Sequence, residues 1–241
     1  MHADQFRAQL YHLPDDPAET KDVSAEHPEV VKGLSALLDL YRDGGYSREL
    51  PPVMVKKEAA ITELPAVSGE TVLAAALDAM PAKPWTALRG QWTAQEGGLW
   101  GVQKGAADQG ATLRVPVDVT DGVIEYRIQF RGANRHSLRI EAGEKRGSFR
   151  IEISRSYAGI TKNPDPGADT STTELLARKN LSLKAGVWYP VRISFKGSTA
   201  TLQVNDNTLT ATHPILAEKK SALNFLVFGE SAGFQQLKII R

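Results

Sequence analysis

The residues best suited to chemistry lie between positions 123 and 154, where charged and amide side chains alternate with apolar ones. The polar positions of this pattern are Glu125, Arg127, Gln129, Arg139, Glu141, Arg150 and Glu152. Guanidinium groups bind sulfate or carboxylate through paired hydrogen bonds. Two carboxyl groups about 5–9.5 Å apart can cleave a glycosidic bond as acid and base. The pattern therefore predicts an anion-binding surface, a catalytic pair of Glu125 with Glu141 or Glu152, or a solvated ladder of cross-strand ion pairs.

The same stretch carries a local excess of positive charge. Residues 121–155 contain eight Lys and Arg residues and five Asp and Glu residues. Such an excess attracts polyanions, although several of these side chains lie at predicted turns, where charge is common. The excess is therefore compatible with an acidic ligand, but ordinary surface charge at turns is the simpler interpretation.

Tryptophan side chains offer a second type of binding surface. Trp85, Trp92 and Trp100 either stack on the flat face of a ligand or pack in the core, and the core is the simpler expectation for two of them. Trp188 begins a strongly apolar run and is expected in the core. The candidate ligand-binding residues are Arg127, Gln129, Arg139, Glu141, Arg150, Glu152 and Trp100, and no catalytic residue is assigned.

Metal ligands form no recognisable pattern in the sequence. The chain has no cysteine, and the histidines considered as zinc ligands are scattered: His12, His27, His136 and His213. Loop residues with oxygen donors that could hold Ca²⁺ are Asn163, Asp165, Asp169, Asp206 and Asn207. Because turn chemistry explains these residues equally well, we expect no cofactor, with Ca²⁺ as the one candidate.

The elements that position these side chains are predicted to be strands. Ile124, Tyr126, Ile128 and Phe130 recur with a period of two, which is typical of a half-buried strand. Turns are expected at 131–136 and 142–147. Further strands are expected at 112–117, 137–141, 148–154, 175–183, 187–196, 199–204, 208–212, 223–228 and 234–240, with a polar loop over about 158–174. Ten to twelve short strands at this spacing predict a mainly β fold, an antiparallel two-sheet β-sandwich.

The N-terminal part follows a different pattern. Residues 1–49 contain one predicted amphipathic helix at 28–43, with an apolar stripe formed by Val30, Val31, Leu34, Leu37, Leu38 and Tyr41. Residues 50–83 are interpreted as a linker with a short strand at 53–56 and a helical turn within 71–83, and residues 84–241 as the sandwich. The stripe is expected to dock on another surface, and a homodimer through this helix is one possibility.

Composition narrows the class of protein. The formal net charge is +1 among 241 residues, with 41% hydrophobic and 24% charged residues. This balance gives no reason to expect nucleic acid or an acidic membrane as a partner. No apolar run reaches the length of a membrane span, and no signal peptide is visible in MHADQFRAQL.

Residues 6–48 or so resemble the C-terminal tail of type I (formylglycine-dependent) sulfatases. The residues that carry the resemblance are Leu10, Tyr11, Leu13, Asp16, Pro17, Glu19, His27, Pro28, Val30 and Leu34. In that family this tail is structural, and the family's catalytic pattern is not found here. The resemblance implies that the remainder of a parent sulfatase chain is a partner and that the parent protein is periplasmic or extracellular.

Residues 84–241 resemble the concanavalin A-like lectin and glucanase superfamily, including laminin-G-like and DUF1080 (3-keto-disaccharide hydrolase) domains. The carriers are Gln91-Trp92, Gly97–Trp100, Gly122–Phe130, Trp188–Ile193, Leu202–Asn205 and Gly233–Leu237. The resemblance implies a jelly-roll sandwich with a glycan or polysaccharide on the face of one sheet. It departs from DUF1080 at 132–137, GANRHS. We therefore expect a non-catalytic accessory module; the alternatives are a DUF1080-type glycoside hydrolase and a structural or interaction domain.

Overall fold

The computed structural model describes residues 9–44, 64–105, 109–143, 147–167 and 171–241. The chain divides into two compact units, residues 1–58 and 59–241, and each is described by itself. Within the described residues, no helix is long and apolar enough to cross a membrane.

The N-terminal unit consists of a loop and one helix, α1 (Pro28–Gly44), which confirms the predicted helix. The loop is held by side-chain caps: Asp16 accepts hydrogen bonds from the backbone of Thr20 and Lys21. These bonds lower the pKa of the Asp16 carboxyl. On α1, Val30, Leu34 and Leu38 are exposed, and the docking expected of the stripe stays a prediction. The homodimer through this helix stays a prediction.

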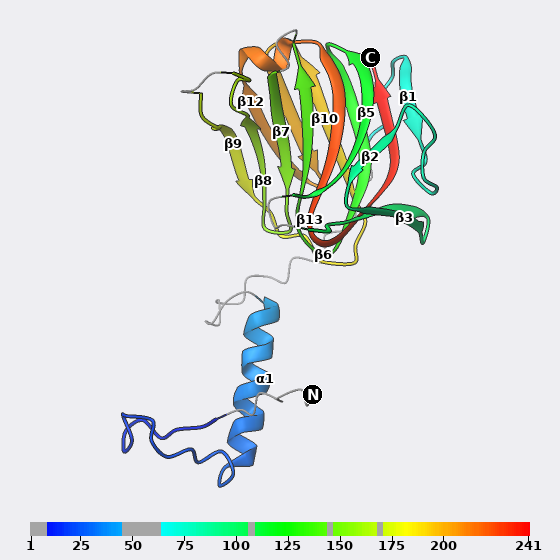
Figure 1. Ribbon diagram of the computed structural model, residues 1–241. Helices are drawn as coiled ribbons and strands as arrows, with labels where there is room; N and C mark the ends of the chain where they lie inside the picture. The colour runs from blue at the N-terminus through cyan, green and yellow to red at the C-terminus, as the bar shows by residue number, and fades with distance from the viewer. Residues whose placement is uncertain (1–8, 45–63, 106–108, 144–146, 168–170) are drawn as a thin grey trace. The chain divides into compact units, whose positions relative to one another are not determined.

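The second unit is built almost entirely from strands (Figure 1). Their bounds are β1 (Thr71–Ala75), β2 (Thr86–Arg89), β3 (Gln91–Gln95), β4 (Gly98–Val102), β5 (Ala111–Val119), β6 (Gly122–Ala142), β7 (Gly147–Ile153), β8 (Tyr157–Lys162), β9 (Glu174–Asn180), β10 (Tyr189–Lys196), β11 (Thr199–Val204), β12 (Asn207–Thr212) and β13 (Lys220–Ile240). A short 3-10 helix, η1 (Pro214–Ala217), precedes β13.

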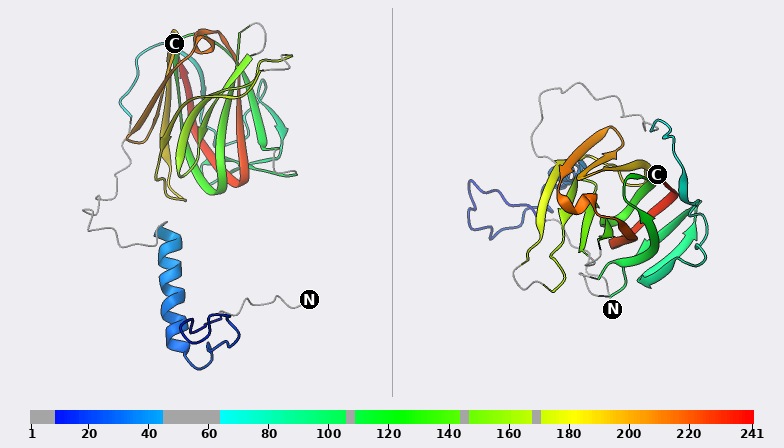
Figure 2. Two further views of the ribbon diagram at one scale, coloured as in Figure 1. Left: turned by 90° about the vertical axis from the view of Figure 1, so that its left-hand side faces the viewer. Right: turned by 90° about the horizontal axis from the view of Figure 1, so that it is seen from above.

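These strands form two layers joined by β6 and β13, which pair with each other over almost their whole length (Figure 2). Layer 1 contains the first half of β6 and the second half of β13, with β10, β11 and β12 on one side and β4, β3 and β1 on the other. Layer 2 contains the other halves, with β7, β8 and β9 on one side and β5 and β2 on the other. The predicted antiparallel β-sandwich is confirmed.

The turn expected at 131–136 is wrong, because β6 bends there without reversing. Gly132 lies in this bend and Gly229 lies opposite it on β13, with φ angles of 80° and 95°. The register between β6 and β13 shifts at the same place. Glycine is the residue that adopts such angles at low cost, and bulges bend strands. The strands predicted on either side of residues 131–136 are therefore one long strand, β6. In the same way, the strands predicted at 223–228 and 234–240 are both part of β13.

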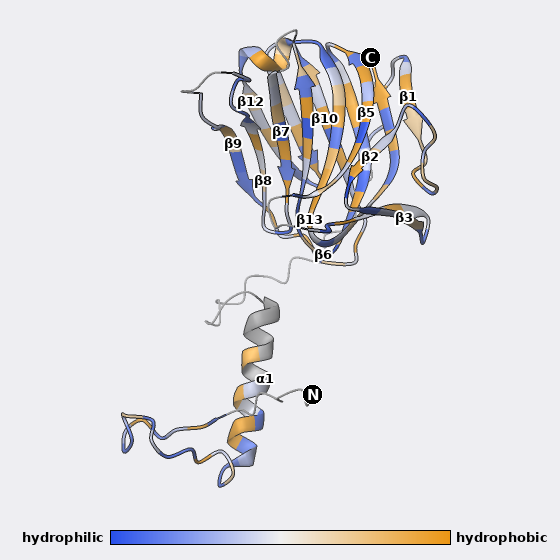
Figure 3. Ribbon diagram, in the orientation of Figure 1, coloured by the Kyte–Doolittle hydropathy of each residue, from blue (hydrophilic) through white to orange (hydrophobic). Residues whose placement is uncertain are grey.

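The core lies between the layers. Along each half of β6 the inward side chains are almost fully buried, among them Ile124, Ile128, Leu138 and Ile140. The alternation of apolar and polar residues that this requires is visible along the strands in Figure 3. Outward side chains of the same strands, such as Glu141 and Arg139, remain partly or largely accessible.

Two further predictions differ from the structure. Residues 71–75 form β1, not a helical turn, because TVLAA pairs with the end of β13. Residues 157–162 form β8 between β7 and β9, inside the stretch expected to be a loop. The strand predicted at 53–56 lies outside the described residues.

Candidate functional site

The outer face of layer 2 collects arginine side chains from five strands. Outward positions alternate with the core positions of β5, β6, β7 and β9, and the cross-strand register aligns them in rows. One row runs Arg114, Asn224, Arg139, Arg150, Thr161; the next runs Thr112, Leu226, Ser137, Glu152, Gly159, Arg178. We define the arginine face as Arg89, Arg114, Arg135, Arg139, Arg150 and Arg178 with Glu141 and Glu152.

One glutamate of the arginine face is fully engaged. Glu141 accepts hydrogen bonds from Arg114 Nη2 and Asn224 Nδ2, both at 3.1 Å. Burial by itself raises the pKa of the Glu141 carboxyl, but these two hydrogen bonds and the charges of Arg114 and Arg139 outweigh it and lower the pKa below its ordinary value. Glu141 is therefore ionised at neutral pH.

The second glutamate, Glu152, is loosely held. Its Oε1 lies 3.8 Å from Arg135 Nε and 4.0 Å from Arg150 Nη1, beyond the distance of a direct hydrogen bond. Arg135 also stacks on Phe228, with its guanidinium carbon 4.3 Å from the ring centre. This part of the face has charged groups in place but few direct bonds between them.

A cavity of about 360 Å³ opens on the arginine face. Its lining residues are Leu88, Arg89, Thr112, Arg114, Arg139, Glu141, Asn224 and Leu226. Among them, Arg139 is exposed and donates through Nε to the hydroxyl of Ser148 at 3.2 Å. The lining thus combines cationic donors, one ionised carboxylate and two leucines.

The glutamates do not form the close pair that hydrolysis of a glycosidic bond requires. Glu141 lies opposite Ser148 of β7, and Glu152 lies on β7 four residues further along. The two glutamates are therefore roughly 13 Å apart at the rise of a strand.

Glu125 lies in the other layer, where its carboxylate accepts a hydrogen bond from Arg192 Nε at 2.7 Å. The backbone carbonyl of Pro65 accepts a further hydrogen bond from Arg192.

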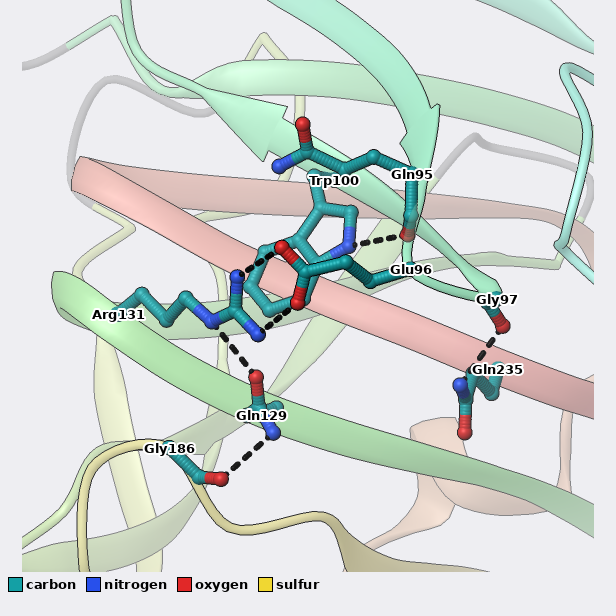
Figure 4. A network of polar contacts seen from close by, with 8 residues as sticks. All are labelled: Gln95, Glu96, Gly97, Trp100, Gln129, Arg131, Gly186 and Gln235. Atoms are coloured by element: carbon teal, nitrogen blue, oxygen red, sulfur yellow. Dashed lines mark hydrogen bonds and ion pairs between the residues drawn. The ribbon is translucent and has the colours of Figure 1, made fainter.

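The outer face of layer 1 also carries three of the predicted site residues, Arg127, Gln129 and Trp100. The bend of β6 separates them from the other four, which lie on the arginine face: Arg139, Glu141, Arg150 and Glu152. Gln129 donates to the carbonyl of Gly186 at 2.7 Å and accepts from Arg131 Nε at 2.8 Å. Arg131 donates to the carboxylate of Glu96 through its two terminal guanidinium nitrogens, Nη1 and Nη2 (Figure 4). The seven predicted residues are therefore divided between two faces.

Arg131 also covers Trp100. Its guanidinium carbon lies 4.1 Å from the centre of the indole ring, and the Trp100 Nε1–H donates to the carbonyl of Gln95 at 2.9 Å. Trp100 is 1% exposed although its ring lies outside the core cluster. Its ring face is thus occupied by an arginine and is not open to a ligand.

The other tryptophans are placed differently. Trp85 belongs to the core and Trp92 packs against it. Trp188 is half-buried, with its ring edge-on to Trp100 at 5.6 Å; the expectation that it lies in the core is wrong because its ring covers Gly98 of β4 on the outer side of layer 1.

Most loop oxygen donors have protein partners. Asn163 donates to Ser148, Asp165 pairs with Lys162, and Asp206 accepts from Asn207. Asp169 lies outside the described residues. No group of three His, Cys, Asp or Glu residues suited to a metal ion occurs in the described part of the chain.

Four arginines of the arginine face, and Asn224 beside it, were not among the predicted site residues. Arg114 and Asn224 lie on β5 and β13, and their strands were predicted, but not their place beside β6. Alternation alone marks them as outward. The pairing of β13 with both β5 and β6 brings them to Glu141.

Comparison with known proteins identifies the fold. No family model and no curated protein matches the sequence. Among solved structures, carbohydrate-binding module CBM66 from Bacillus subtilis has 15% identity and a TM-score of 0.51, covering 65% of this chain and 95% of that chain. A β-glucanase from Bacillus licheniformis has 10% identity and a TM-score of 0.53 over 73% of this chain and 100% of that one. A Bacillus subtilis protein of unknown function with a galectin-like fold has 13% identity and a TM-score of 0.54 over 71% and 96%.

At these identities the likeness concerns the fold. The sulfatase and DUF1080 resemblances gain no support from the comparisons. The second unit has the β-sandwich fold shared by concanavalin A-like lectins and glucanases.

Proposed function

We propose that the sandwich is a non-catalytic module that binds an acidic polysaccharide on the arginine face. The observation that carries this proposal is the meeting of six arginines with two glutamates on one face of layer 2. The surplus positive charge attracts anionic chains. Guanidinium forks match the geometry of carboxylate and sulfate groups.

The choice of a carbohydrate is supported by the fold. Structures that resemble this sandwich are named as a carbohydrate-binding module and a β-glucanase. The arginine face supplies the preference for acidic chains. Arg139 and Arg150 are the main contacts in this proposal, because Arg114 is already neutralised by Glu141.

Binding is better supported than hydrolysis. A general acid needs a carboxyl group with a raised pKa, whereas the pKa of Glu141 is lowered. The separation of about 13 Å between Glu141 and Glu152 also exceeds the usual range for paired carboxylates. A role beside a sulfatase-like catalytic domain, at a periplasmic or extracellular location, stays a prediction from about residues 6–48.

Affinity gel electrophoresis tests the proposal. The full chain is run in gels that contain alginate, polygalacturonate or dextran sulfate, with neutral dextran as the control, at about 50 mM and about 500 mM NaCl. Retardation by an acidic polymer that weakens at high salt supports the proposal. No retardation by any acidic polymer, or equal and salt-independent retardation by neutral dextran, contradicts it.

A further inference from the structure

Three buried polar atoms gather on the arginine face without a hydrogen-bond partner among the residues that the structure describes. They are Ser137 Oγ, Arg135 Nε and Arg150 Nε. Ser137 is only 1% exposed. A buried donor or acceptor without a partner costs about 1–3 kcal/mol, and most such groups in proteins are satisfied. Three of them around one point leave hydrogen-bonding capacity that a water or the hydroxyl group of a bound molecule can satisfy.

The point they surround is the carboxylate of Glu152. Ser137 is its direct cross-strand neighbour, and Arg135 and Arg150 approach the same oxygen at 3.8 and 4.0 Å. Polar groups at this separation are commonly bridged by a hydroxyl or a water. A hydroxyl group suits the gap because it accepts from a guanidinium and donates to a carboxylate at once. A bare anion suits it less, because Glu152 repels negative charge.

The floor beside Glu152 has one position without a side chain, although its backbone is buried. Gly159 is the cross-strand neighbour of Glu152 on β8, and an added Cβ there would meet only ordinary contacts, Ala177 O at 3.5 Å and Leu175 Cδ1 at 4.0 Å. On the other side of Ser137 lies Leu226, which is half-buried and apolar. A sugar ring presents both hydroxyl groups and apolar C–H faces.

We infer that Ser137, Glu152, Arg135 and Arg150 form a subsite for two adjacent hydroxyl groups of one sugar unit. One hydroxyl donates to Glu152 and accepts from Arg135 or Arg150. The second accepts from Ser137, which lies between the outward Arg135 and Arg139 on β6, so these long side chains shift to admit it. The inference rests on the proposed function and adds which chemical group this part of the face recognises.

Periodate-treated ligands test this inference, because periodate cleaves adjacent diols and leaves the carboxylates of the polymer. Alginate and polygalacturonate are used before and after periodate oxidation and borohydride reduction. After this treatment the two hydroxyl groups remain as primary alcohols but are no longer held on adjacent ring carbons. The wild-type chain is expected to bind the treated polymers roughly tenfold more weakly, in keeping with the loss of one hydrogen bond to a charged group.

Three variants locate the effect. Glu152→Gln and Ser137→Ala are expected to weaken binding of the native polymers several-fold and to lose the discrimination against oxidised ones. Gly159→Val fills the floor and is expected to abolish binding. Thr201→Ala, on the outer face of layer 1, is the matched control and should bind as wild type. Circular dichroism checks that each variant is folded.

The two hypotheses fail in different ways. If the wild-type chain binds no acidic polymer, the proposed function is wrong, and the inferred subsite, which depends on it, is wrong as well. If it binds native and oxidised polymers equally, or if Glu152→Gln and Ser137→Ala discriminate as wild type does, the subsite is wrong while the proposed function stands.

Discussion

His136 and Tyr126 form a hydrogen bond inside the aromatic core, with Nε2 of the imidazole 3.0 Å from the phenolic oxygen. The other ring nitrogen, Nδ1, lies 3.0 Å from the carbonyl of Leu226. Because a carbonyl only accepts, Nδ1 carries the proton and Nε2 accepts the hydrogen of Tyr126. Burial raises the pKa of Tyr126 and lowers the pKa of His136 to about 3.

This pair predicts a loss of stability in acid. The pKa of His136 is about 3 when folded, against an ordinary value of 6.5, so the unfolded chain binds the proton more tightly between these values. The stabilising effect is complete above pH 6.5 and is lost as the pH falls towards 3. Between pH 7 and pH 4 it amounts to about 3 kcal/mol. Urea unfolding of wild type and His136→Phe at both pH values measures it; an equal pH dependence in the two proteins would contradict the assignment.

Lys220 predicts a gain of stability in base. Its ammonium group is buried, donates to the carbonyls of Thr120 and Leu216 at 2.5 Å, and lies over Phe195. Burial lowers its pKa from 10.5 to about 8, against the opposing charges of Asp121 and Glu218. The folded state therefore gains up to about 3 kcal/mol as the pH rises from 8 to 10.5. Lys220→Met should lack this rise in urea unfolding, and a parallel rise in the variant would show that another group causes it.

Arg131 is predicted to shield Trp100. Removing the guanidinium in Arg131→Ala uncovers the ring face that it covers at 4.1 Å and frees Glu96 from its ion pair. Acrylamide quenching of tryptophan fluorescence should increase. Arg178→Ala, which removes an arginine stacked on Tyr157, is the control and should leave the quenching unchanged. No increase in Arg131→Ala would mean that other groups cover Trp100.

Two glycines are predicted to respond oppositely to the same change. A Cβ at Gly233 would lie 2.8–2.9 Å from the ring of Trp100, whereas a Cβ at Gly159 would meet nothing closer than 3.5 Å. Gly233→Ala should lower the free energy of unfolding by about 1–3 kcal/mol through overpacking. Gly159→Ala should leave it unchanged or raise it slightly, because glycine weakens strands. Urea unfolding of both variants decides the matter, and equal effects would count against the placement of Trp100.

The sequence predicted the strands better than it predicted their grouping. Ile124 and Leu138 mark inward positions by alternation alone, and both are buried. Alternation does not reveal that β6 passes from one layer to the other at Gly132, because a glycine in a polar stretch is equally typical of a turn. The sequence analysis therefore placed Gln129 and Arg139 in one binding surface, although they lie on the outer faces of different layers. Pairing between distant strands, such as Asn224 with both Arg114 and Arg139, is set by the tertiary fold.

The most direct test of the account is the effect of two arginines on binding to an acidic polysaccharide. Arg139→Gln combined with Arg150→Gln removes two charges from the arginine face, and Lys196→Gln combined with Lys238→Gln removes two charges from layer 1. Dissociation constants for the acidic polymer that retards the wild-type chain most are measured for all three proteins at low and high salt. The account predicts at least a roughly tenfold loss of affinity and a weaker salt dependence in the arginine variant alone. Equal affinity and salt dependence in both variants would contradict it.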